Sequence, residues 1–156
     1  MAAASSASPA ATTAPILLLD TNVILDVVLA RQPWEADATR LLDRAARGDA
    51  RGFVAGHAVT TIYYIVERVR DRATAVTAVA DLLQVLDVVE LGRADFQRAL
   101  ALGLRDYEDA VQAAACLRIG ARYLVTRNER DFKGAPVTPR SPGEVLAVLG
   151  PPTRSS

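Results

Sequence analysis

Short apolar runs alternate along the chain with longer segments in which apolar residues recur every three or four positions. The first run, PILLLD, is apolar up to Asp20, the pattern of a central parallel strand that is buried on both faces. From Thr21 the apolar positions follow helical spacing until Pro33 interrupts them. The chain is therefore predicted to begin with a strand, a turn and a helix, with Asp20 at the end of the strand.

The same alternation continues to the end of the chain. We predict further strands at 52–55, 86–91 and 122–125, and further helices at 34–48, 59–69, 73–85, 93–102 and 106–120. A short final helix follows Ser141, which supplies an N-cap with Pro142 at the first helical position. Strands that alternate with helices predict a parallel sheet covered on both faces, a three-layer α/β/α sandwich.

The composition fits one globular domain. The 156 residues, 51% of them hydrophobic, are enough to bury a core, and we expect the domain at 16–149. We expect disordered tails at 1–15 and 150–156, and the first of them lacks the basic and apolar regions of a secretory signal. No apolar run approaches the roughly 20 residues that cross a bilayer. Cys116 is the only cysteine, which excludes an internal disulfide and fits a cytoplasmic protein with a thiol packed in the core.

The charge balance changes where a nucleic-acid contact should be sought. Eighteen basic and 18 acidic residues give no overall positive field of the kind that marks nucleic-acid binders. Arginine, the better bidentate partner of phosphate, supplies all the positive charge except that of Lys133. Two arginine groups, 40, 44, 47 and 51 and then 68, 70 and 72, are either solvated helix faces or contacts to an RNA backbone.

Acidic residues stand just after the predicted strands or in the first turn of the late helix. Asp20 follows the first strand, Asp106, Glu108 and Asp109 begin the helix at 106–120, and Asp131 lies beyond the strand at 122–125. Ligands of such sheets bind at the carboxyl ends of the strands, so we expect these acids to converge. Carboxylates held together favour a hard cation, Mg²⁺ or Mn²⁺, which can activate water for attack on a phosphodiester.

Each acid also has a structural explanation. Asp20 and Asp106 are placed to cap the helices that follow them, and Asp131 is compatible with a plain loop position. Residues three apart share one face of a helix, so Asp106 and Asp109 are expected to point the same way and Glu108 elsewhere.

The segments LLLDTNVILD, EDAVQAAA and LVTRNERDF resemble, in order and spacing, the motifs of the PIN-domain family, and the resemblance extends from Ile16 to about Leu149. It implies an α/β/α sandwich and Mg²⁺- or Mn²⁺-dependent endonucleolytic cleavage of RNA. Many small bacterial members are the ribonuclease toxins of type II toxin–antitoxin pairs, which implies a cognate antitoxin. By position, Asp20 and Asp109 match the family's metal-ligand aspartates, and Asp131 matches its late acid.

The resemblance also assigns polar residues around the metal. Thr126 and Asn128 match polar groups near the scissile phosphate, and Asn22 matches a group that orients Asp20 or a bound water. The family resemblance further implies a homodimer, for which Trp34 is a candidate contact residue.

One family feature is missing from the sequence. The family usually places an acid in the helix after the second strand, near Thr60 or Thr61, and the chain has a Thr-Thr-aromatic variant there. Glu67 is seven residues after Thr60 and therefore about 10 Å farther along the helix axis. Glu108, beside Asp109, is the other candidate for the missing charge, acting through a bound water.

Other conspicuous residues and functions fit the sequence less well. We interpret His57 as a cap or packing residue, and Tyr63 and Tyr64 as core residues with their hydroxyls at the surface. A receiver-like phosphoacceptor domain would place a lysine at a late strand, but Lys133 falls in a loop. An aspartyl phosphatase would have an acid in place of Asn22. A non-catalytic PIN module that binds RNA or protein stays open.

Overall fold

A parallel sheet forms the centre of the fold. The computed structural model describes residues 14–154, so the tail predicted at 1–15 lies outside it except for the last two positions. Five strands, all paired in parallel, follow the order β3-β2-β1-β4-β5. They are β1 (Ile16–Leu19), β2 (Arg51–Ala55), β3 (Asp87–Val89), β4 (Tyr123–Val125) and β5 (Pro139–Arg140). Receiver-like domains follow the order 2-1-3-4-5, so the strand order excludes that alternative.

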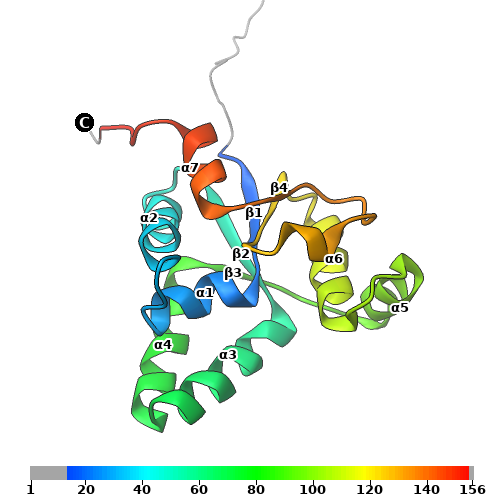
Figure 1. The fold of residues 1–156 in the computed structure, drawn as a ribbon, viewed down its shortest axis with the longest axis horizontal. Helices are drawn as coiled ribbons and strands as arrows, with labels where there is room; N and C mark the ends of the chain where they lie inside the picture. Colours follow the sequence, from blue (N-terminus) through cyan, green and yellow to red (C-terminus); the bar gives the residue numbers. More distant parts are fainter. Residues whose placement is uncertain (1–13, 155–156) are drawn as a thin grey trace, which may run out of the picture.

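Helices cover both faces of the sheet. They are α1 (Thr21–Val28), α2 (Glu35–Ala46), α3 (Gly56–Val69), α4 (Arg72–Val85), α5 (Arg93–Leu102), α6 (Tyr107–Ile119), α7 (Pro142–Leu149) and the short 3₁₀ helix η1 (Glu129–Phe132). Helices α2 and α7 lie on one side of the sheet and α5 and α6 on the other, while α3 and α4 extend below it in Figure 1. This arrangement confirms the predicted α/β/α sandwich. No helix within 14–154 has the length and apolar character needed to cross a bilayer.

The core explains the first apolar run. Leu17, Leu18 and Leu19 are completely buried, because β1 is the central strand and helices cover it on both sides. Cys116 is buried on α6, as predicted for a core thiol. Tyr64 is 64% exposed, so its prediction as a core residue was wrong, since it faces solvent on α3.

The structure shifts several predicted boundaries, that of α1 the most, and adds two elements. Helix α1 ends at Val28, before the predicted stop at Pro33, because the backbone at Ala30 adopts the left-handed region with φ 51°. Strand β5 and helix η1 were not predicted. Both are too short to carry a periodic pattern, and β5 exists through its pairing with β4.

Arg44 is buried, which contradicts its assignment to a solvated or RNA-binding face. It is 7% exposed, and its Nε donates to the carboxylate of Asp49 at 2.6 Å. Its Nη1 donates to the carbonyl of Gly150 at 2.7 Å, and the Thr153 hydroxyl donates to Asp49 at 3.0 Å. Arg44 therefore ties α2 to the segment that follows α7.

We expect Arg44→Ala to lower the free energy of unfolding by about 2 kcal/mol, because it removes buried charge-assisted hydrogen bonds and the donor to Gly150. Urea denaturation measures this change. Arg40→Ala is the matched control on the same helix, since its ion pair with Asp37 is exposed and such pairs contribute less than about 1 kcal/mol. Equal losses in the two variants would contradict a structural role for the buried arginine.

Candidate active site

Asp20 joins the end of β1 to the start of α1 with its carboxylate inside the protein. The residue is 4% exposed, and its backbone N–H donates to the carbonyl of Val125 at 2.9 Å, which aligns it with the end of β4. Although Asp20 occupies the N-cap of α1, its side chain makes no capping hydrogen bond within the described chain. Its Oδ2 instead accepts from the Thr126 hydroxyl at 2.9 Å. The capping explanation for Asp20 is therefore wrong.

The polar residues after β4 support Asp20 and border an open hollow. Thr126 is fully buried, and its Oγ1 also accepts from the backbone N–H of Asn128 at 3.0 Å, so it orients Asp20. Asn128, Arg130 and Asp131 line the hollow beside η1.

Asn22, in the first turn of α1, accepts a hydrogen bond from the Arg31 guanidinium at 3.4 Å. The substrate-directed roles of Asn22 and Asn128 stay predictions.

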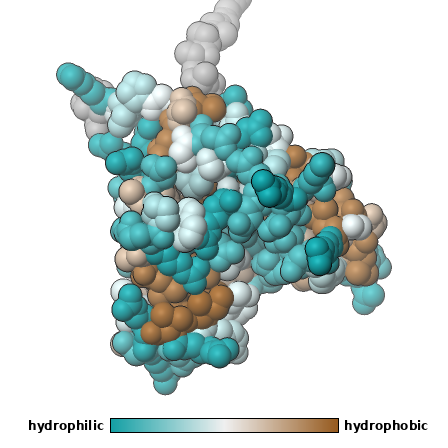
Figure 2. Space-filling view, viewed as in Figure 1, coloured by the Kyte–Doolittle hydropathy of each residue, from teal (hydrophilic) through white to brown (hydrophobic). Residues whose placement is uncertain are grey.

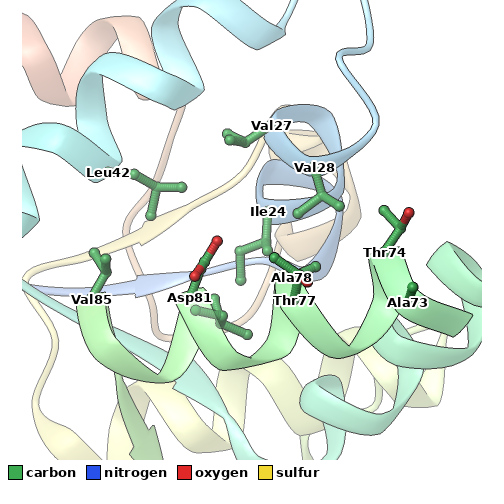
Figure 3. Close-up of a pocket in the computed structure, with 11 residues that line it drawn as sticks. Ile24, Val27, Val28, Leu42, Ala73, Thr74, Thr77, Ala78, Asp81 and Val85 are labelled. Carbon is green, nitrogen blue, oxygen red and sulfur yellow. The ribbon is translucent and has the colours of Figure 1, made fainter.

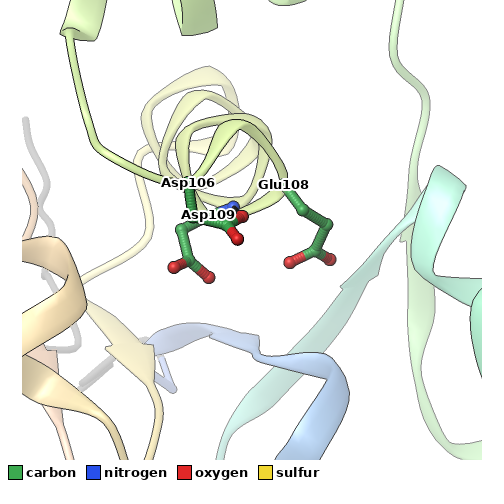
Figure 4. A group of neighbouring side chains, drawn as sticks. All are labelled: Asp106, Glu108 and Asp109. Atoms are coloured by element: carbon green, nitrogen blue, oxygen red, sulfur yellow. Dashed lines mark hydrogen bonds between the residues drawn. The ribbon is translucent and has the colours of Figure 1, made fainter.

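Three carboxylates come together at the start of α6. Asp106 accepts from the backbone N–H of Asp109 at 3.0 Å, which confirms the predicted N-cap. One carboxylate oxygen from each of Asp106, Glu108 and Asp109 lies within 4.8 Å of the others. Figure 4 shows these side chains directed from α6 toward the blue segment that joins β1 and α1. The expectation that Glu108 points elsewhere was wrong, because contacts with neighbouring elements direct its long side chain.

Those contacts come from three elements. Glu108 Oε1 accepts hydrogen bonds from His57 Nε2 at 3.0 Å, from Gln112 Nε2 at 3.3 Å and from the Thr21 hydroxyl at 3.4 Å. The hydrogen bond from His57 is the main reason that the pKa of Glu108 lies below its usual value, with burial acting in the opposite direction. The interpretation of His57 as a cap or packing residue therefore missed its principal contact.

Two signals in the sequence could have found this group. His57 lies two residues after the end of β2, at the same carboxyl edge of the sheet as Asp20. Gln112 is a polar, fully buried residue in the Ala-rich stretch of α6, four residues after Glu108. Positions four apart on a helix are neighbours, so the pair was visible in the sequence.

Asp131 completes the acidic site. It lines a second open hollow together with Arg105, Asp106 and Asp109, which places it opposite the start of α6. The negative charges of Glu108 and Asp131 both act on Asp20. The predicted convergence of the strand-end acids with those of α6 is therefore present.

Asp20 and Asp109 are held in a setting that disfavours their charged forms. Burial, followed by the charges of Asp106, Asp20, Glu108 and Asp131, raises the pKa of Asp109 to about 7. Burial is also the main cause that raises the pKa of Asp20 to about 6, although the Thr126 hydrogen bond opposes it. Five oxygen-donor side chains that repel one another fit a hard divalent cation such as Mg²⁺ or Mn²⁺.

The acid that the family usually places on α3 is not replaced by another acid of that helix. None of the carboxylates named as raising the pKa of Asp20 or Asp109 belongs to α3. Thr60 and Thr61 both donate to the carbonyl of His57, at 3.0 and 3.3 Å. Glu108, and not Glu67, is among the carboxylates that raise the pKa of Asp109. Of the two candidates for the missing charge, the geometry favours Glu108.

Arg127 and its contacts were also missed in the sequence. Its Nε lies 3.5 Å from the carboxylate of Asp26, which is buried, and its guanidinium lies 3.8 Å from the centre of the Trp34 ring. This links the loop after β4 to the connection between α1 and α2. Trp34 is 44% exposed, and self-association through it stays a prediction.

Comparison with protein families places this geometry in context. A family model described as PIN domain matches residues 16–130, a span that contains Asp20 and Asp109 and ends one residue before Asp131. Ribonuclease VapC1 of Aquifex aeolicus strain VF5 is 24% identical over 124 residues, which are 74% of this chain and 83% of that protein.

Solved structures share the fold. VapBC from Salmonella typhimurium bound to DNA gives a TM-score of 0.67 at 14% identity, over 82% of this chain and 98% of that one. VapBC2 from Rickettsia felis, bound to a DNA fragment from its promoter, gives 0.66 at 16% identity, over 81% and 98%. VapC20 of Mycobacterium tuberculosis, a toxin that cleaves the sarcin-ricin loop, gives 0.59 at 18% identity, over 69% and 86%.

Proposed function

Because the chain belongs to the PIN domain family, we propose that it is an endoribonuclease that uses Mg²⁺ or Mn²⁺ to hydrolyse RNA phosphodiester bonds. The observation that carries the proposal is the gathering of Asp20, Asp109 and Asp131 at the carboxyl ends of parallel strands, where burial and mutual repulsion raise the pKa values of the first two. The name of the Aquifex relative, a ribonuclease, supports RNA as the substrate class.

The proposed ligands of the cation are Asp20, Asp109 and Asp131. When bound, such a cation lowers the pKa of water and neutralises charge on the phosphate. Thr126 holds the Asp20 carboxylate toward the site through its 2.9 Å hydrogen bond. Asp106 caps α6 and orients the backbone at Asp109, while Asn22 and Asn128 are proposed to orient water and substrate.

Arginines at the rim offset the acidic centre for a phosphate backbone. Arg105 lines the hollow that contains Asp109, and Arg127 and Arg130 line the adjacent hollow beside Asp131. Guanidinium groups donate in pairs to phosphate oxygens. These residues are better placed for RNA than the arginines of α2, of which Arg44 is buried.

The proposal is tested with the purified full chain and fluorescently labelled RNA, with EDTA, Mg²⁺ or Mn²⁺ added. We expect cleavage with either cation and none with EDTA. Failure to cleave any RNA, combined with retained binding of Mn²⁺, would favour the alternative of a non-catalytic PIN module.

We further propose that the protein is the toxin of a type II pair and binds its antitoxin in an apolar groove. The groove has a volume of about 530 Å³ and lies between α1, α2 and α4. Its apolar walls come from Ile24, Val27 and Val28, with Leu42 and Val85 opposite (Figure 3). Figure 2 shows a hydrophobic area over α1 and α4. Such a groove suits the apolar face of a partner's helix, and one of the solved structures that share the fold is a toxin–antitoxin complex from Klebsiella pneumoniae.

Ala78→Glu is expected to weaken antitoxin binding by at least about 10-fold, because it places a charge on the apolar wall of the groove. The measurement is calorimetric titration with the cognate antitoxin, sought among the products of short reading frames beside this gene. Val76→Glu is the matched control, since Val76 is an exposed residue of the same helix that does not line the groove. Both variants should keep full ribonuclease activity. Equal affinity for the parent and for Ala78→Glu would place the antitoxin elsewhere.

A further inference from the structure

Helix α3 reaches the acidic site through a histidine. The hydroxyls of Thr60 and Thr61 donate to the backbone carbonyl of His57, so both threonine side chains are bonded to their own helix. His57 stands in the first turn of α3, and its Nε2 lies 3.0 Å from Glu108 Oε1 on α6. The helix that would carry an acid in related sequences therefore supplies a hydrogen-bond donor to an acid of another helix.

The hydrogen bonds to Glu108 converge on one of its two oxygens. Oε1 accepts hydrogen bonds from His57, from Gln112 and from the Thr21 hydroxyl. The oxygen of that hydroxyl also accepts a hydrogen bond from Gln112 Nε2 at 3.0 Å. Among residues 14–154, no hydrogen bond is formed by Oε2. Three donors on Oε1 restrict rotation of the carboxylate, and Oε2 is left to meet a ligand.

The position of Glu108 fits a direct role at the cation. Glu108 and Asp109 are adjacent in sequence, and their carboxylates belong to the group of oxygens within 4.8 Å of one another. Glu108 also acts on the buried Asp20 across the site. Its carboxylate therefore lies beside the other acids of α6 and accepts from the hydroxyl of Thr21, the residue that follows Asp20.

We propose that His57 is a positioning residue, and that through its hydrogen bond to Oε1 it holds Glu108 as a direct ligand of the divalent cation, in place of the acid that α3 lacks. The inference rests on the proposed cation-dependent function. In this chain the carboxylate comes from α6 and not from α3, and α3 contributes the hydrogen-bond donor His57. The number of negative charges around the cation is therefore preserved.

A double-mutant cycle read by Mn²⁺ affinity tests this relation. Calorimetric titration of the full chain with Mn²⁺ is carried out on His57→Leu, Glu108→Gln and the double variant. We expect either single substitution to weaken Mn²⁺ binding by about 10- to 100-fold. The double variant should bind within about twofold of Glu108→Gln, because removal of the carboxylate leaves His57 nothing to position.

Two further variants separate positioning from general structural support. His57→Gln retains an amide donor near the position of Nε2 and is expected to recover most of the Mn²⁺ affinity. Thr60→Ala is the control on the same turn of α3, since within residues 14–154 its hydroxyl hydrogen-bonds only to the carbonyl of His57, and it should bind Mn²⁺ as the parent does. Thermal melts without Mn²⁺ establish that each variant is folded.

Two results would overturn the inference. One is unchanged Mn²⁺ affinity in His57→Leu; the other is a double variant in which the two single losses multiply, since His57 would then act independently of Glu108. The proposed function is judged by a different arm, Asp109→Asn. If that substitution leaves Mn²⁺ binding intact, or if the parent binds no Mn²⁺, the cation site itself is wrong.

Discussion

Asp20→Asn and Asp109→Asn are each expected to reduce Mn²⁺-dependent RNA cleavage by roughly 10³-fold or more. Each substitution replaces a charged oxygen ligand by a neutral amide while keeping the shape of the side chain. Loss of the cation forfeits several kcal/mol of stabilisation of the developing charge, and each 1.4 kcal/mol corresponds to about tenfold in rate. Single-turnover rates on a labelled RNA, measured at saturating Mn²⁺, give the size of the effect.

A matched substitution outside the site controls for charge alone. Asp87→Asn changes the net charge equally at an exposed position of β3, and its cleavage rate should equal that of the parent. If Asp20→Asn and Asp109→Asn cleave RNA as fast as Asp87→Asn, these carboxylates do not form the active site. Activity that persists in EDTA would contradict the dependence on a cation.

Without a divalent cation, the acidic site is expected to destabilise the protein as pH rises from about 4 to 7. The pKa of Asp20 is about 6 in the folded chain and 3.8 in the unfolded reference, so the folded state binds more protons in this interval. Stability falls with rising pH wherever the folded state holds the extra proton, and the favourable contribution present at pH 4 is lost above pH 6. Asp109, with a pKa of about 7, extends the loss toward neutral pH, with a smaller effect because it is partly exposed.

Asp20→Asn should remove most of this pH dependence. At pH 8 without cation, the variant is expected to be more stable than the parent by about 1–3 kcal/mol, because the amide can accept the Thr126 hydrogen bond without burying a charge. At pH 4 the two proteins should differ little. Urea denaturation at both pH values measures the difference, and the same decline with pH in both proteins would contradict the assignment to Asp20.

Added Mn²⁺ should reverse the order of the two proteins. Cation binding requires ionised carboxylates, so the parent is expected to gain stability from Mn²⁺ at pH 8 and much less at pH 5. Asp20→Asn should gain little at either pH. The variant would then be inactive yet more stable than the cation-free parent, as expected where a functional site holds repelling charges.

The apolar and polar pattern of the chain was sufficient to predict the parallel sheet, the helices that cover it and the acids at its edge. A completely apolar strand that ends in a carboxylate fits few positions in a fold, because the strand must be buried on both faces while its carboxyl end reaches the surface. The position of Asp20 follows from that rule without any knowledge of side-chain contacts, whereas Asp109 and Asp131 were expected to join it because a helix start and a loop lie at the same edge of the sheet.

Which side chains meet each other was decided only by the tertiary structure. Spacing along a helix predicted that Glu108 turns away from Asp109, but donors from α1 and α3 direct it into the site. Arg44 has the spacing of a surface arginine, yet the chain after α7 covers it. Periodicity predicts only the face of the helix or strand from which a side chain leaves the backbone. A long polar side chain ends where partners from distant parts of the sequence satisfy its hydrogen bonds and charge, and those partners are brought to it by the fold.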